Sequence, residues 1–233
     1  MPTNHNATEQ TGMKLHAAQK ALTLVEPGMT VGLGSGSTAT IWIRLLGEKV
    51  RDHGLRIRAI ASSEDSERLG KSFGIPFVTF EECRSLDLTV DGADEIAPGL
   101  ALIKGGGGKL LREKIVASAS KRFVIVADES KQVEKLGRFP LPVEVIQMAM
   151  PLVSDSLKKL GFTPRIRVNA DGSHYITDEG NLILDCSGLL IDDPKRLAAE
   201  LDSIVGVVEH GLFLGMANLA IVAGERQIIE RTV

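Results

Sequence analysis

Short apolar runs and stretches with apolar residues at helical spacing follow one another along the first half of the chain. Apolar runs bounded by glycine, proline or polar residues predict strands at 29–33, 57–61, 75–80, 86–90 and 122–127. Helical spacing between and around these runs predicts helices over 15–25, 42–54, 63–73 and 110–119. Because this alternation is typical of parallel β-α-β units, it predicts an α/β protein with an open parallel sheet.

The order of elements changes near Leu136. The pattern there predicts strands at 141–146, 164–168, 182–186 and around 207, with helices near 151–160 and 194–204. This β-α-β-β-α-β order is typical of a small ferredoxin-like α+β domain, and the apolar segment 212–223 should then rejoin the first sheet. We therefore expect a flexible tail over 1–12, a main domain over 13–136 and 207–233, and an inserted domain over 137–206.

Composition narrows the range of partners. Lys and Arg number 27 against 30 Asp and Glu, a formal net charge of −3, and no basic run is interleaved with aromatic residues, so nucleic acid is not expected as a partner. No apolar run approaches the roughly 20 residues of a membrane-spanning helix. The polar first dozen residues do not resemble a signal peptide, and Cys83 and Cys186 form no disulfide-type pattern. A cytoplasmic location is therefore expected.

Charged residues and glycines concentrate between residues 87 and 115. Asp91 and Asp94 follow the strand predicted at 86–90, on the side of an open α/β sheet where ligands usually bind. Lys104 directly precedes four glycines at 105–108, and these lead into a helix that carries Glu113 about one turn from its start. A glycine loop before a helix can hold an anion, because the first N–H groups of the helix have no partner within it.

The same residues have simpler structural interpretations. Asp91 and Asp94 could cap a turn after the strand, and Glu113 could pair with Lys109 or Lys114 on the helix surface. Their concentration beside one glycine loop favours a shared functional site.

A second loop of small residues reads Gly-Ser-Gly-Ser-Thr at 34–38, between a predicted strand and a predicted helix. Ser37 stands where the third glycine of a dinucleotide-binding fingerprint belongs, and no Gly-Lys-Ser/Thr of a nucleotide-binding P-loop follows. Hydroxyl and backbone donors ahead of a helix suit a single phosphate, although the loop could also be only a turn and helix cap.

The absence of other motifs restricts the chemistry. The histidines are scattered without metal-ligand spacing, so metal-free chemistry is expected, and no nucleophile elbow or Cys/His arrangement points to acyl transfer. A carboxylate base, a lysine, loop amides and a phosphate site can together move a proton next to a carbonyl of a phosphorylated small molecule, with stabilisation of the enediolate.

In these motifs the chain resembles the type A ribose-5-phosphate isomerases. The resemblance runs from about Met13 to the C-terminal segment and rests on GSGSTA at 34–39, VDGADEI at 90–96, IKGGG at 103–107, LREKI at 111–115, ADESKQV at 127–133 and FPLPVEVIQMA at 139–149. It implies a cytosolic, metal-free aldose–ketose isomerase of the pentose phosphate pathway, with a Rossmann-like core, a smaller α+β domain, and assembly into a homodimer or homotetramer.

The resemblance also implies roles for individual residues. Glu113 would be the base, Lys104 would hold substrate oxygens and the enediolate, and Asp91 and Asp94 would assist ring opening and proton movement at the hydroxyls. The remaining substrate-binding residues implied are Gly92, Ala93, Gly105, Gly106 and Gly107 around the sugar, and Ser35, Gly36, Ser37, Thr38, Lys131 and Lys14 around the phosphate. No cofactor is implied.

The chain departs from the family pattern at two places. Ser35 stands where threonine is common, which keeps a hydroxyl, and Gly108-Lys109 places an additional cation beside the glycine loop. Two alternatives remain open at this stage: a non-catalytic sugar-phosphate sensor, which would not need both Lys104 and Glu113, and an amino-sugar phosphate deaminase, which would release ammonia.

Overall fold

The computed structural model describes residues 4–224 and 228–232. The chain divides into two compact units. The first consists of Met1–Ala93, Arg112–Lys131 and Gly215–Val233, and the second of Asp94–Leu111 and Gln132–Leu214. None of the helices in the described ranges is long and apolar enough to span a bilayer.

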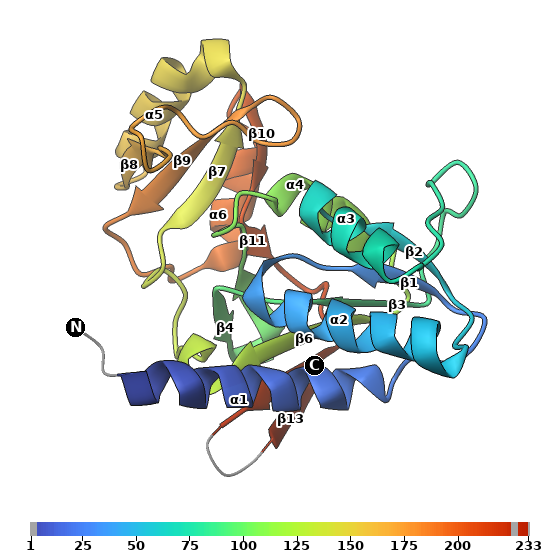
Figure 1. The fold of residues 1–233 in the computed structure, drawn as a ribbon. Coiled ribbons are helices and arrows are strands. Elements are labelled where there is room, and N and C mark those ends of the chain that lie inside the picture. The colour runs from blue at the N-terminus through green and yellow to red at the C-terminus, as the bar shows by residue number, and fades with distance from the viewer. Residues whose placement is uncertain (1–3, 225–227, 233) are drawn as a thin grey trace. The chain divides into compact units, whose positions relative to one another are not determined.

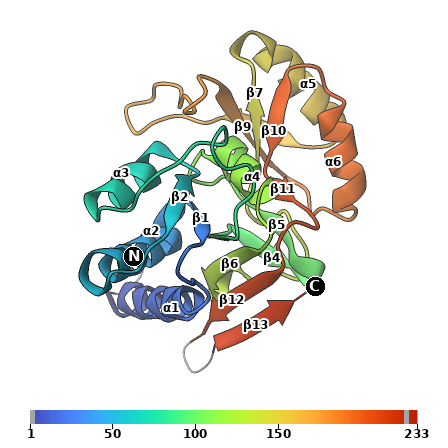
Figure 2. The same ribbon diagram turned by 90° about the vertical axis from the view of Figure 1, so that its right-hand side faces the viewer.

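The first unit is built on one sheet, made of β1 (Thr30–Leu33), β2 (Arg58–Ala61), β3 (Leu88–Asp91), β6 (Phe123–Asp128), β12 (Leu219–Ala223) and β13 (Ile228–Thr232). The strand order is β13-β12-β6-β3-β1-β2, and all neighbours are parallel except β12 and β13 (Figure 2). All residues of β1, β3, β6 and β12 are buried, as expected of strands covered on both faces. Because β1, β3 and β6 are parallel, the loops that follow them leave from the same edge.

Helices cover both faces of this sheet. On one face, α1 (Asn4–Leu22) and α2 (Gly36–His53) pack side by side, with α3 (Glu64–Ser72) next to α2 (Figure 1). On the other face lies α4 (Leu110–Ser118), whose Val116 approaches β1 so closely that a Cβ at Gly32 would be 2.7 Å from its Cγ1. Local signals set the helix ends: Ser63 caps α3 by accepting from Ser66 N, and Gly54 ends α2 with φ 68°.

The second unit contains two antiparallel sheets. The smaller has the order β11-β5-β4, formed by β4 (Glu95–Ala97), β5 (Ala101–Ile103) and β11 (Leu212–Phe213). The larger has the order β10-β7-β9-β8, formed by β7 (Leu141–Val145), β8 (Thr163–Ile166), β9 (Leu182–Ser187) and β10 (Val207–His210). With α5 (Met150–Lys159) and α6 (Pro194–Asp202), its elements follow the predicted β-α-β-β-α-β order. The expected fold class, a parallel α/β core with a smaller α+β part, is confirmed.

Four details differ from the sequence-based expectations. Helix α1 begins at Asn4, where a flexible tail was expected through residue 12; residues 1–3 lie outside the described residues. The segment 75–80 forms only an isolated bridge, Ala59 to Phe77, rather than a strand. Pro76 explains this difference, because it has no N–H to donate to a ladder.

The other two differences concern the division of the chain. The apolar segment 212–223 splits: β12 joins the parallel sheet as expected, but β11 pairs with β5. Because β5 and β4 pair with β11, residues 94–111 belong to the second unit, whereas the expected insertion began at 137. This pairing was not predicted, because β4, β5 and β11 are each only two or three residues long and so leave little hydrophobic pattern.

Candidate active site

The loop at 34–38 leaves the end of β1 and passes directly over Asp91. A Cβ added at Gly34 would lie 2.3 Å from Asp91 Cγ, so only glycine fits at that position. Asp91 Oδ1 accepts hydrogen bonds from Ser35 N at 2.8 Å and from Gly92 N at 2.7 Å, and the residue is 1% exposed. The carboxylate therefore fixes the start of the loop and brings Asp91 and Ser35 together.

The N-terminus of α2 follows this loop. Ser35 occupies the N-cap position but makes no side-chain cap bond, because its hydroxyl pairs with Ser62 Oγ at 2.8 Å. Ser66 Oγ donates to Gly34 O at 2.6 Å and holds the loop from the other side. Neither Ser62 nor Ser66 was singled out from the sequence, so their supporting role was missed. The start of a helix presents N–H groups and the positive end of the helix dipole, so this loop has the chemistry to bind an anion.

Two lysines predicted to bind phosphate lie in the same unit. Lys14, on α1, donates from Nζ to Ser37 Oγ at 3.0 Å, so the helix brings a cation to the loop. Lys131 is half-buried at the end of the 3₁₀ turn η2 (Glu129–Lys131), which follows β6. Asp128 holds that turn by accepting hydrogen bonds from the backbone N–H and the hydroxyl of Ser130. Lys131 thus leaves the same sheet edge as the loop at 34–38.

Glu113 lies in the first turn of α4 and is 5% exposed. A glutamate that merely paired with Lys109 or Lys114 on a helix surface would be solvent-accessible, so its burial argues against that interpretation. The close packing of Val116 against Gly32 holds this helix on the sheet.

In the second unit, Lys104 follows β5 and is 2% exposed, which is rare for lysine. Its backbone N–H donates to Gly211 O at 2.9 Å, and its Nζ lies 5.5 Å from the centroid of the Phe213 ring, within cation–π range. Both partners come from the segment around β11, so the pairing of β11 with β5 is what encloses this lysine.

Asp94 and the glycine loop form one hydrogen-bonded arrangement. Asp94 Oδ2 accepts from Gly106 N at 2.7 Å, and a Cβ at residue 106 would lie 2.5 Å from Asp94 Oδ1. Gly107 is exposed, and a Cβ there would meet no atom within 4 Å. The loop therefore packs tightly against Asp94 at one residue and is open to an approaching molecule at the next. No sequence motif marks Arg167, Tyr175 or Asp178, which contact residues of this loop or Lys109.

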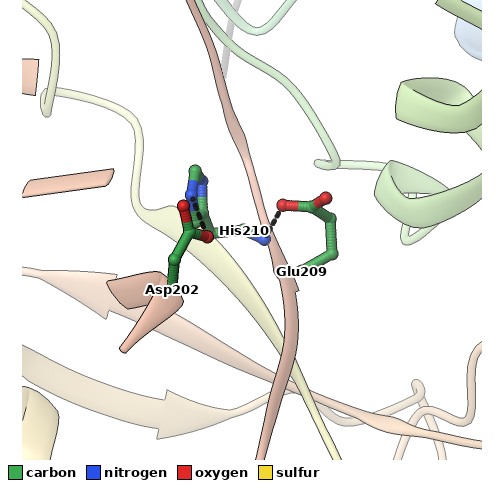
Figure 3. A group of neighbouring side chains, drawn as sticks. All are labelled: Asp202, Glu209 and His210. Carbon is green, nitrogen blue, oxygen red and sulfur yellow. Dashed lines mark hydrogen bonds and ion pairs between the residues drawn. The ribbon is translucent and has the colours of Figure 1, made fainter. Parts of the chain in front are cut away.

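Among the described residues, one group of three side chains could hold a metal ion: Asp202, Glu209 and His210 (Figure 3). His210 Nε2 lies 3.2 Å from Asp202 Oδ1, and Nδ1 accepts a hydrogen bond from Leu212 N. Glu209 Oε1 accepts from the backbone N–H of His210, and its side chain extends to the other side of the strand from the imidazole. Protein groups thus engage both imidazole nitrogens, which accounts for the cluster without an ion.

Comparison with known proteins places the chain in a family. The model of ribose 5-phosphate isomerase A (phosphoriboisomerase A) matches residues 58–227. Ribose-5-phosphate isomerase A of Roseiflexus castenholzii is 52% identical over 216 residues, which is 92% of each chain. That of Sinorhizobium fredii is 52% identical over 217 residues, covering 91% of this chain and 94% of its own. The chain belongs to the ribose 5-phosphate isomerase A family.

Solved structures of this family have the same fold. A D-ribose-5-phosphate isomerase in complex with phospho-erythronic acid is 35% identical with a TM-score of 0.92, covering 95% of this chain and 98% of its own. Ribose 5-phosphate isomerase A from Methanocaldococcus jannaschii is 40% identical with a TM-score of 0.91, and the match covers 95% of this chain and 99% of its own. The family predicted from the sequence motifs is therefore confirmed, and with it the expectation of an isomerase; the sensor and deaminase alternatives are not favoured.

Proposed function

We propose that this protein interconverts D-ribose 5-phosphate and D-ribulose 5-phosphate, with Glu113 as the base. The observation that carries the assignment is the burial of Lys104, directly before the glycine loop, and of Glu113, in the helix that follows the loop, at 2% and 5% exposure in a member of an isomerase family. Burial of a carboxylate and of a lysine costs free energy, and such charged groups concentrate at functional sites.

The proposed reaction moves two protons. In the open-chain aldose, Glu113 removes the proton from C2, the C1 carbonyl becomes an enediolate oxygen, and the same carboxyl returns the proton to C1. The proton of the C2 hydroxyl passes to the oxygen on C1. C1 is thereby reduced and C2 oxidised within one molecule, so the reaction balances without an external oxidant or reductant. Lys104 and the loop amides stabilise the charge that develops on the enediolate, which lowers the barrier because this charge is absent in the ground state.

The phosphate is assigned to the loop at 34–38. Ser35, Gly36, Ser37 and Thr38 offer hydroxyl and helix N-terminal N–H groups, and Lys14, which contacts Ser37, adds a positive charge. Lys131 is assigned to the same group because its turn leaves the same sheet edge.

Asp91 and Asp94 are assigned to ring opening and to proton movement at the substrate hydroxyls, with Gly92 and Ala93 between them. Both carboxylates are already oriented by backbone N–H donors, which suits groups that must hold a defined direction toward a substrate. We further propose that the reaction needs no metal, belongs to the pentose phosphate pathway, takes place in the cytoplasm, and is carried out by a homodimer or homotetramer.

One assay tests the core of this proposal. Purified protein treated with EDTA is incubated with ribose 5-phosphate, and ketose formation is followed; turnover at the untreated rate is the expected result. Ribose without phosphate serves as the matched control and should react far more slowly. Absence of ketose formation with or without divalent ions would contradict the isomerase assignment, whereas activity that returns only with a divalent ion would contradict metal-free chemistry.

A further inference from the structure

The glycine loop at 105–108 is held from outside by side chains from a distant part of the chain. Arg167 Nη1 donates to Gly105 O at 2.9 Å and to Gly106 O at 3.1 Å. Tyr175 Oη donates to Gly107 O at 3.3 Å. Three successive carbonyls of the loop are therefore bonded to side chains that lie at least 61 residues further along the chain.

Arg167 is itself held in one orientation. Its Nε donates to Asp185 Oδ2 at 2.9 Å and its Nη2 donates to Asp185 Oδ1, a bidentate pair in which the arginine side chain is 13% exposed. Its guanidinium carbon lies 5.9 Å from the centroid of the Tyr175 ring. Asp185 belongs to β9, which is hydrogen-bonded to a strand on each side in the larger antiparallel sheet. The guanidinium therefore ties the glycine loop to a strand that is held in place.

The bonds to the carbonyls determine where the loop N–H groups point. In a trans peptide, C=O and N–H project in opposite directions. The carbonyl of Gly105 faces Arg167, and the N–H of Gly106 in the same peptide faces Asp94, to which it donates at 2.7 Å. The carbonyl of Gly106 also faces Arg167, so the N–H of Gly107 is turned away from the arginine, at a residue that is exposed and has open space around it.

A loop of glycines needs such an external support. Glycine has no side chain to pack and populates positive and negative φ almost equally, so four in succession have little intrinsic preference for one conformation. In this loop Gly105 and Gly108 have φ of +97° and +78°, and the only short internal bond described is Gly108 N to Gly105 O at 2.9 Å. The remaining order has to come from outside the loop.

Lys109 provides the second anchor. This additional cation of the sequence forms an ion pair with Asp178, and the two side chains are only 16% and 12% exposed. The turn that carries Asp178 is tied to buried Glu144, which accepts from Thr177 Oγ1 at 2.8 Å and from Asn181 Nδ2 at 3.0 Å. Lys109 is thus part of the loop support rather than an additional charge offered to a ligand.

We propose that Arg167 is a positioning residue of the isomerase, which keeps the Gly106 amide on Asp94 and the Gly107 amide directed into open space, and thereby sets the stabilisation of the enediolate by the Gly107 N–H. Tyr175 and the Lys109–Asp178 pair assist it. This inference rests on the proposed function, because the amides matter only if charge develops beside them. Arg167 does not touch the substrate in this proposal; it acts through the glycine loop.

The proposal predicts an effect on turnover rather than on phosphate binding. Arg167→Met should lower kcat by about 10- to 100-fold, since misplacement of oriented groups by an ångström costs on that order, while KM changes little. Arg167→Lys should recover only part of the activity, because an ammonium cannot bond to Asp185 bidentately and also reach two carbonyls. Arg165→Met is the matched control, because Arg165 is exposed on β8 two residues earlier.

Two probes separate positioning from a general structural role. Phospho-erythronic acid, whose carboxylate mimics the enediolate oxygens, should inhibit Arg167→Met about tenfold more weakly, while inhibition by inorganic phosphate should stay unchanged. A merely structural defect would lower the unfolding temperature and weaken both inhibitors together. Added guanidinium ion should restore part of the kcat of Arg167→Ala and leave Arg165→Met unaffected.

The outcomes distinguish failure of this inference from failure of the proposed function. If the wild-type enzyme does not isomerise ribose 5-phosphate, the proposed function is wrong. If the wild-type enzyme is active and Arg167→Met keeps its kcat, Arg167 has no positioning role. Should Arg167→Met not fold, Tyr175→Phe removes one hydroxyl at the surface of the loop; it should lower kcat a few-fold without a change in KM, and an unchanged kcat would then overturn the proposal.

Discussion

Gly34 and Asp91 share one space, in which the missing side chain of the glycine is replaced by the carboxylate of the aspartate. A Cβ at residue 34 would lie 2.3 Å from Asp91 Cγ and 2.5 Å from Asp91 Cα. Neither the loop nor the end of β3 can accept that atom without moving. The position of Asp91 and the path of the loop at 34–38 therefore depend on each other, and a change in one moves the other.

Replacement of Gly34 should affect both stability and activity. Gly34→Ala forces a side chain into a filled space, which typically costs about 1–3 kcal/mol of unfolding free energy, and it should displace the loop and raise KM. Chemical denaturation and steady-state kinetics measure the two effects. Gly12→Ala is the control, because Gly12 lies in α1 and a Cβ there would meet no atom within 4 Å. Alanine favours a helix more than glycine does, so this variant should be as stable as the wild type or more stable. Equal behaviour of the two variants would refute the close packing.

Substitution of Glu113 tests the base. Glu113→Gln keeps the shape of the side chain and removes its basicity, so kcat should fall by about 10²- to 10⁴-fold while the fold and substrate binding persist. The variant should also stop exchanging solvent deuterium into C2 of the aldose and C1 of the ketose, which NMR detects. Glu64→Gln, at an exposed first-turn position of α3, should remain fully active. A Glu113→Gln enzyme with more than about a tenth of wild-type kcat would return the role to Asp91 or Asp94.

The phosphate group should act mainly through binding. Ser37→Ala and Lys131→Ala are expected to raise KM more than they lower kcat, because contacts to a group remote from the reacting carbons are similar in ground and transition states. The inhibition constant of inorganic phosphate should rise in parallel. Lys195→Ala, at an exposed position of α6, serves as the control. A fall in kcat at constant KM would argue against phosphate binding by these residues.

The buried Glu144 should make stability depend on pH. Burial raises the pKa of Glu144 above its ordinary value of 4.5, and the hydrogen bonds from Asn181 and Thr177 offset this only in part. Between the pKa of the unfolded state and the higher pKa of the folded state, the folded protein holds the proton of Glu144 more tightly than the unfolded chain does. This carboxyl therefore contributes stability at low pH, and the contribution is lost as the pH rises through the folded pKa. Glu144→Gln removes the titration.

Thermal unfolding at a series of pH values checks this expectation. Relative to wild type, Glu144→Gln should become more stable as the pH rises above 4.5, with the difference levelling off once wild-type Glu144 is ionised. Glu134→Gln, exposed in the same unit, should show no such trend. A stability difference that does not change with pH would mean that Glu144 titrates normally.

Much of the candidate site was predictable because its residues are close in sequence. Asp91 ends a strand and Glu113 lies in the first turn of a helix, and both elements could be read from local patterns. Lys104 was marked only by the glycines that follow it, because β5 was not predicted. The contact of Lys14 with Ser37 could be inferred only from family resemblance, because nothing local marks one lysine of a helix as special.

The supports of the site were not predictable, because they come from distant positions. Arg167 is 62 residues from Gly105, and an arginine after a short strand has no sequence signature that distinguishes it from a solvated one. Leu212 and Phe213 begin an apolar segment that was expected to join the parallel sheet, but they pair with β5. Local hydrophobicity predicts that such residues are buried and does not tell which strand they pair with.

The contact between Gly108 and Tyr175 has a consequence for how the family can vary. A Cβ at Gly108 would lie 2.4 Å from Tyr175 Oη, and the φ of +78° disfavours other residues as well. The choice of amino acid at position 108 is therefore conditional on position 175. A relative with a bulkier residue at 108 must have moved or replaced the whole ring at 175, because the added Cβ would also lie 2.5 Å from Tyr175 Cε1 and Cζ. In directed evolution, a side chain at 108 should therefore be tolerated only together with a smaller residue at 175.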